Sequence, residues 1–159
     1  MKIALLALGS LAIVLGVLAT VFVVGMRAKW PRLLDAVRRT GRAMKPLALR
    51  SAGTANSPTS VVHHVGRRSG RPYETPVVAA PTEDGFVIAL PYGQRADWMK
   101  NVLAAGRATV DRDGATHAVE APELITIDEA NPHFPAQEQR RHHQFKVTEA
   151  LRLRSVAAR

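Results

Sequence analysis

The stretch VVHHVGRRSGRPYETPVV, residues 61–78, predicts two β-strands joined by a glycine-containing loop. Valine-rich runs flank the loop, and glycine and serine favour tight turns. A hairpin turn alone requires none of the three arginines in this loop, so the added positive charge indicates an anion-binding role. Backbone N–H groups, guanidinium groups and the serine hydroxyl can together bind phosphate or carboxylate. The candidate binding residues are Gly66, Arg67, Arg68, Ser69, Gly70 and Arg71.

From the residues alone, a solvated turn remains an alternative for this loop. It lacks the GxxxxGK[ST] spacing of a nucleotide-binding loop, and it also lacks GxGxxG. The ligand therefore has to be inferred from the rest of the chain.

After residue 50 the chain alternates short strand-like runs with short turns, and it shows no internal repeat. Such connections favour a mainly β fold with two helical insertions, arranged as an antiparallel sheet or a small barrel. One helix is expected to end near Gly106, and Asp128 is expected to cap a second, broken helix. The expected strands are 60–66, 73–80, 86–90, 109–111, 116–120 with a continuation at 124–127, and 147–153.

The positive charge of the chain is concentrated near its N-terminal end. The net charge is +9, of which residues 27–50 carry +7 and residues 51–159 only +1. A broad phosphate-binding face is therefore not expected, and we predict no nucleic-acid partner. The sequence contains no cysteine, so neither a disulfide framework nor a thiolate metal site is possible.

Residues 1–26 are predicted to form a transmembrane anchor, because Ile3 to Met26 carries no charge. As a helix these 24 residues would extend roughly 36 Å, enough to cross a bilayer. A cleaved signal peptide is the alternative, but cations rather than a cleavage site follow the apolar run. Positive residues remain on the cytoplasmic side, so we expect a single-pass membrane protein whose domain, residues 51–159, faces the cytoplasm.

The basic juxtamembrane segment, residues 27–50, is expected to lie close to anionic lipid, with Trp30 near the headgroups. Its apolar positions only partly fit a helical face, because Gly41 and Pro46 interrupt the pattern. A solvated basic linker is the alternative.

Histidine and serine patterns give little support for metal or nucleophilic chemistry. His63 and His64 are adjacent, so on a strand they point to opposite faces and cannot share an ion. Ser69 lacks the G-x-S-x-G context of a hydrolase nucleophile. We predict no metal site and assign no catalytic residue.

The stretch LPYGQRADWMKN, residues 90–101, predicts a strand that leads into a helix. Gly93 permits close approach of a flat ring, and the start of the helix favours an anion. Trp98 and Asn101 are three residues apart and share a helix face. The alternative is a core tryptophan with an exposed Asn101.

Together, GRRSGRPYETPVV, FVIALPYG and DWMKNVLAAG closely resemble the deazaflavin-dependent nitroreductase family, from about Pro46 to Leu153. This resemblance implies a split β-barrel related to the flavin-reductase and pyridoxamine-phosphate-oxidase folds. It also implies that the arginine loop binds the phosphate and acidic tail of coenzyme F(420), an 8-hydroxy-5-deazaflavin with a phospholactyl oligoglutamate. The matching positions are Arg67, Arg68, Ser69, Gly70, Pro76, Tyr92, Gly93, Trp98 and Asn101.

Two positions depart from the family pattern. Tyr73 stands where some members have Arg or Lys, so Arg71 would have to supply that charge. The C-terminal tyrosines that shape the nitroreductase substrate pocket are absent, which leaves the substrate open.

The resemblance implies an oxidoreductase that transfers a hydride from the reduced coenzyme to a quinone, an enone or a nitro compound. Tyr92, His63, His64 or water could supply the proton. The membrane anchor favours a lipid-soluble acceptor and membrane lipid as partners, and the resemblance adds a homodimer. An FMN-dependent oxidoreductase of the same fold and a non-catalytic, membrane-tethered cofactor-binding protein remain the alternatives.

Overall fold

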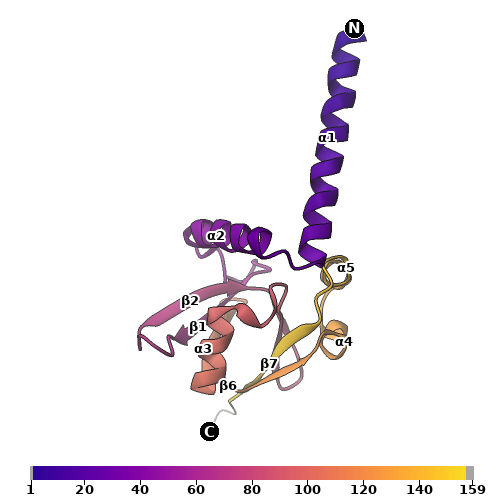
Figure 1. The fold of residues 1–159 in the computed structure, drawn as a ribbon. Helices are drawn as coiled ribbons and strands as arrows, with labels where there is room; N and C mark the ends of the chain where they lie inside the picture. Colours follow the sequence, from indigo (N-terminus) through magenta and orange to yellow (C-terminus); the bar gives the residue numbers. More distant parts are fainter. Residues whose placement is uncertain (1, 157–159) are drawn as a thin grey trace.

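The computed structural model describes residues 2–156 and consists of a small barrel with helices and one long projecting helix (Figure 1). The described elements, in chain order, are α1 (Lys2–Arg27), α2 (Pro31–Ala48), β1 (Ser60–Val65), β2 (Pro72–Val77), β3 (Ala79–Pro81), β4 (Gly85–Ala89), η1 (Gly93–Arg95), α3 (Asp97–Ala105), β5 (Arg107–Arg112), β6 (Ala115–Thr126), α4 (Ile127–Ala130), η2 (Asn131–His133), α5 (Ala136–Gln144) and β7 (Glu149–Ser155).

The strands of the described chain form one antiparallel sheet in the order β2-β1-β5-β6-β7-β4-β3. The strand expected at 73–80 is in fact two strands, since Val78 separates β2 from β3. β2 forms one edge of the sheet and β3 the other, so the two edges meet at this one-residue corner. The sheet is thereby curled into a barrel, which confirms the expected mainly β split barrel with helices.

The inside of the barrel is filled by large apolar side chains from most strands, and α3 packs against it. Met99 and Val102 of α3 are buried in this core with strand residues such as Val62 and Leu151. The helix ends at Gly106, whose φ of 70° gives the left-handed C-cap expected from the sequence. The core therefore fixes α3 beside β1, which later determines the shape of the site.

The outer face of β4 and β7 is covered by α4, η2 and α5 through a second apolar cluster that contains Val87, Ala150 and Phe134. α4 is capped by Thr126, whose hydroxyl accepts the backbone N–H of Glu129 at 3.3 Å. The expectation that Asp128 caps this helix is wrong. Thr126, two residues before Asp128, is the cap, and its hydroxyl exchanges hydrogen bonds with the backbone and side chain of Glu129.

Helix α1 extends away from the barrel, whereas α2 turns sharply and lies along it (Figure 1). The bend is at Lys29, which has a φ of 54°, and Gly25 packs there against Trp30 and Leu33. α2 is one continuous helix that includes both Gly41 and Pro46, the residues that interrupt its apolar pattern.

The C-terminal end of α1 is attached to the end of α5. Arg27 donates to the carbonyl of Gln144 at 3.3 Å, and Lys29 Nζ donates to the carbonyls of Pro91 at 3.0 Å and Phe145 at 3.4 Å. Cations at a helix C-terminus are stabilised by its unpaired carbonyls. Burial lowers the pKa of Lys29, and the contacts place the start of α2 firmly beside the barrel.

A cavity-forming substitution tests whether the barrel core carries the stability of the fold. Leu151 is fully buried on β7, and its register partner on β6, Leu124, is 37 % exposed. We expect Leu151→Ala to lower the free energy of unfolding by about 2–5 kcal/mol and Leu124→Ala by less than about 1 kcal/mol. Chemical denaturation of both variants measures the difference, and equal losses would contradict this placement of the core.

Candidate cofactor-binding site

A cavity of about 680 Å³ lies where the arginine loop, the start of α3 and helix α2 meet. Gly66 to Ser69 and β2 form one wall, Tyr92 to Asn101 form the second, and α2 forms the third. The lining residues with polar or aromatic side chains are Arg38, Arg42, Lys45, His64, Arg67, Arg68, Ser69, Tyr73, Glu74, Thr75, Tyr92, Arg95, Asp97, Trp98 and Asn101.

The arginine loop is a compact turn held by its own backbone. The N–H of Gly66 donates to the carbonyl of Arg71, and the N–H of Gly70 donates to the carbonyl of Gly66, both at 2.8 Å. Gly70 has a φ of 65°, which favours glycine. A Cβ on Gly66 would lie 2.5 Å from Ser69 Oγ and 2.7 Å from the Tyr73 ring, so this glycine permits close packing.

The buried side chain of Asn101 joins this loop to α3. Its Oδ1 accepts the backbone N–H of Arg67 at 3.2 Å and the Arg67 guanidinium at 2.8 Å. The same guanidinium pairs with Asp97 at 3.2 Å. Asn101 is only 6 % exposed, so the alternative of an exposed Asn101 is wrong, and the residue also lines the cavity.

The orientation of Asn101 determines which ring nitrogen of neutral His64 carries the proton. Because Oδ1 faces Arg67, the amide NH₂ donates to His64 Nδ1 at 3.2 Å. The proton of a neutral imidazole is then on Nε2, which donates to Thr75 Oγ1 at 3.1 Å. Burial, then Lys45 and His63, lower the pKa of His64, so the neutral form is favoured. Thr75 lines the cavity and can donate its own hydroxyl proton there.

Tyr92 forms the opposite side of the cavity. Burial raises the pKa of its phenol, with a smaller opposing effect from Arg38, so the hydroxyl remains a hydrogen-bond donor at neutral pH. The Arg38 guanidinium donates to the carbonyl of Tyr92 at 3.4 Å. The Nε of Arg38 is buried and has no hydrogen-bond partner among the described residues.

Most of the residues predicted from the sequence meet at this cavity. Gly70, Arg71 and Gly93 do not line it. Gly70 in the loop and Gly93 at the start of η1 both have positive φ values, and Arg71 is exposed. The predicted residues that do line it are Gly66, Arg67, Arg68, Ser69, Pro76, Tyr92, Trp98 and Asn101.

Sequence reasoning missed the contribution of α2 and of Thr75. Arg38, Arg42 and Lys45 line the cavity at helical spacings of four and three residues. That spacing is visible in the sequence, and it would have indicated one cationic helix face. Thr75 precedes Pro76 and carries no local signal of its role.

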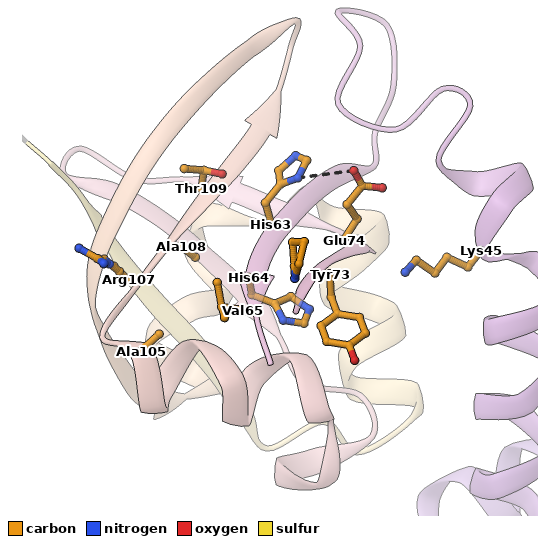
Figure 2. A pocket seen from close by; sticks show the side chains of 11 residues that line it. Lys45, His63, His64, Val65, Tyr73, Glu74, Ala105, Arg107, Ala108 and Thr109 are labelled. Atoms are coloured by element: carbon orange, nitrogen blue, oxygen red, sulfur yellow. Dashed lines mark ion pairs between the residues drawn. The ribbon is translucent and has the colours of Figure 1, made fainter. Parts of the chain in front are cut away.

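A second cavity, of about 790 Å³, adjoins the first where β1 and β5 separate (Figure 2). The two cavities share Lys45, His64, Tyr73 and Glu74. His63 lies on the other face of β1, where its Nε2 is 2.6 Å from Asp111 Oδ2 and its Nδ1 is 3.7 Å from Glu74. The adjacent histidines therefore have separate partners, and the described residues hold no cluster suited to a metal ion.

Comparison with known proteins places this chain in a family. The family model described as F(420)H(2)-dependent quinone reductase matches residues 36–153. No curated protein sequence matches the chain.

Among solved structures, the heme storage protein HutZ from Vibrio cholerae aligns at 13 % identity over 65 % of this chain and 84 % of its own, with a TM-score of 0.47. An F(420)-H2-dependent reductase, FDR-A, aligns at 12 % identity over 59 % of this chain and 91 % of its own, with a TM-score of 0.45. A third structure aligns at 10 % identity over 70 % of this chain and 80 % of its own, with a TM-score of 0.50, a likeness of fold alone.

The family match covers most of the chain and contains the arginine loop, the Tyr92 turn and α3. It confirms the resemblance inferred from the sequence, together with the oxidoreductase class and the cofactor. The chain belongs to the F(420)H(2)-dependent quinone reductase family, and coenzyme F(420) is its cofactor.

Proposed function

We propose that this F(420)-dependent reductase binds its coenzyme in the 680 Å³ cavity and reduces a lipid-soluble quinone at a membrane surface. The observation that carries the proposal is the charge of the cavity wall. Six cationic side chains line it against two carboxylates, those of Glu74 and Asp97. Such an excess suits a ligand that bears a phosphate and several carboxylates.

The residues present fit this coenzyme. The volume is within the usual range of cofactor sites, about 300–1,000 Å³. Arg68 lines the cavity and forms none of the ion pairs found among the described residues, so its guanidinium can meet a phosphate directly. Arg67 is held by Asp97 and Asn101, so it positions the loop as well as adding charge. Trp98 and Tyr92 offer aromatic surface for a flat ring.

When bound and reduced, the deazaflavin supplies a hydride to the acceptor. The protein binds and orients both reactants and excludes water from the cavity. Four hydroxyl groups line the cavity, those of Ser69, Tyr73, Thr75 and Tyr92. Two of them have a defined role as donors: burial keeps Tyr92 protonated, and His64 orients Thr75. We propose that one of them holds a proton near the acceptor oxygen.

The quinone proposal is motivated by α1. Ser10–Arg27 is an apolar helical segment, long enough to cross a membrane, that lies mostly outside the protein interior. Its C-terminal end is bound to α5, so a membrane around α1 would lie close to α2 (Figure 1). Residues of α2 line the cavity. A cytoplasm-facing domain, anionic lipid contact and a homodimer remain predictions.

Two neighbouring arginines of the loop provide a matched pair for testing the coenzyme site. Arg68 lines the cavity, and Arg71 does not. We expect Arg68→Ala to weaken coenzyme F(420) binding about tenfold to a hundredfold, the loss of one charge-assisted contact, and Arg71→Ala to weaken it less than about threefold. Fluorescence titration of the intact chain in detergent measures both dissociation constants.

High salt should weaken wild-type binding more than Arg68→Ala binding, because the variant has lost one ionic contact. FMN serves as the control ligand. Tighter binding of FMN than of the deazaflavin, or equal effects of the two substitutions, would contradict the proposed site.

The neutral state of His64 makes stability depend on pH. Its pKa is lowered from 6.5 in the folded chain, so the unfolded chain takes up the proton first as the pH falls. This contribution to stability is complete above pH 6.5 and is lost as the pH falls toward the lower folded pKa. Gln in place of His64 does not titrate and can still bond Asn101 and Thr75.

We therefore expect the free energy of unfolding of His64→Gln to fall less between pH 7.5 and pH 5.5 than that of the wild type. Denaturation curves at several pH values measure this. His142, whose pKa burial also lowers, is present in both proteins and affects both slopes equally. Identical slopes would show that His64 is not held neutral.

A further inference from the structure

The face of α2 that lines the cavity differs from the rest of the helix. Arg38, Gly41, Arg42 and Lys45 lie at spacings of three and four residues and therefore share one side. Arg39 does not line the cavity and is exposed. The helix thus divides its cations between the cavity and the solvent.

Arg38 is only partly satisfied by the protein. A guanidinium has five N–H donors, and those of Arg38 reach the exposed Asp35 at 3.2 Å and the carbonyl of Tyr92 at 3.4 Å. Its buried Nε has no partner among the described residues, which is costly for a charged group. Arg38 also lines the cavity, where an anion would offset the charge of its guanidinium.

Gly41 is placed where a ligand could approach the helix backbone. Glycine inside a helix costs about 0.5–1 kcal/mol relative to alanine, so a helix interior normally excludes it. A Cβ built on Gly41 meets no atom within 4 Å, so packing against the protein does not require glycine here. Its position between Arg38 and Lys45 leaves open space directly beside the cations of the cavity wall.

Lys45 stands at the junction of the two cavities and extends toward Tyr73 and His64 (Figure 2). After burial, the charge of Lys45 is the next cause that lowers the pKa of His64. Lys45 forms no ion pair among the described residues. A cation close to the site and without a carboxylate partner favours an anionic ligand.

We propose that α2 is the third wall of the coenzyme site and that Arg38, Arg42 and Lys45 bind the acidic tail of the coenzyme opposite Arg68. This inference rests on the proposed function, and it adds α2 to the arginine loop as a second cationic side of the site. The bound polyanion would then bridge the loop and α2, and so hold α2 against the barrel. Coenzyme binding would be coupled to the helix that is joined to α1.

Two double variants of α2 that lower the net charge by the same amount test the proposal. Arg42→Gln with Lys45→Gln removes two cations from the cavity face, and Arg32→Gln with Arg39→Gln removes two exposed cations outside the cavity lining. We expect the first pair to raise the dissociation constant of coenzyme F(420) about tenfold to a hundredfold and the second less than about threefold. Fluorescence titration of the intact chain in zwitterionic nanodiscs provides the readout.

A steric pair gives an independent test. Gly41→Leu places a side chain into the cavity, whereas Ala43→Leu adds the same chain at an exposed position outside the cavity lining. Both substitutions should preserve the helix, since leucine is a good helix former. We expect only Gly41→Leu to weaken coenzyme binding, by at least about tenfold.

The outcomes separate this inference from the proposed function. If Arg68→Ala weakens binding while the cavity-face and exposed variants behave alike, α2 is not part of the site and the proposal for α2 is overturned. If the cavity-face pair instead reduces binding to phosphatidylglycerol vesicles and leaves coenzyme affinity unchanged, these cations serve lipid, which also overturns it. If wild-type protein binds no coenzyme, the proposed function itself fails.

Discussion

The site depends on one buried side-chain amide, that of Asn101. Its oxygen holds both the backbone and the guanidinium of Arg67, and its nitrogen donates to His64. These bonds fix the arginine loop to α3 and determine which nitrogen of His64 carries the proton. If the side-chain amide of Asn101 were flipped, its NH₂ group would face the N–H donors of Arg67, and no hydrogen bond could form there. One orientation therefore organises the loop, the helix and Thr75 together.

A second constraint joins the barrel to the projecting helix. Arg27 and Lys29 bind carbonyls at the end of α5 and near Tyr92, so the bend between α1 and α2 is supported by the domain itself. This support places α2 against the cavity, with cations on its inner side. The end of the apolar helix and the cavity are thus neighbours in space, although residues 28–59 separate α1 from the first strand. This proximity is the basis of the proposal that the acceptor is dissolved in lipid.

The features that follow from local chemistry were predictable from the sequence, and the long-range ones were not. Gly70 and Gly106 take the conformations expected of a turn and a helix end, because glycine is favoured at positive φ. The corner at Val78 depends on which strands meet at the edges of the sheet, which no local pattern reveals. The sequence predicts Asn101 as a ligand contact, and the residue lines the cavity, but its burial and its protein partners arise only from tertiary packing. From the sequence, Arg38 is one cation of a basic segment. Its position against the cavity depends on the bend at Lys29, which the sequence does not reveal.

The central claim is that the coenzyme binds in the cavity between the arginine loop, α3 and α2. A crystal or cryo-electron microscopy structure of the intact chain with coenzyme F(420) tests this most directly. The account predicts coenzyme density within the cavity lined by Arg68, Tyr92 and Trp98, with its acidic tail between the loop and α2. Coenzyme bound instead in the second cavity, against Arg107 and Thr109, would contradict it.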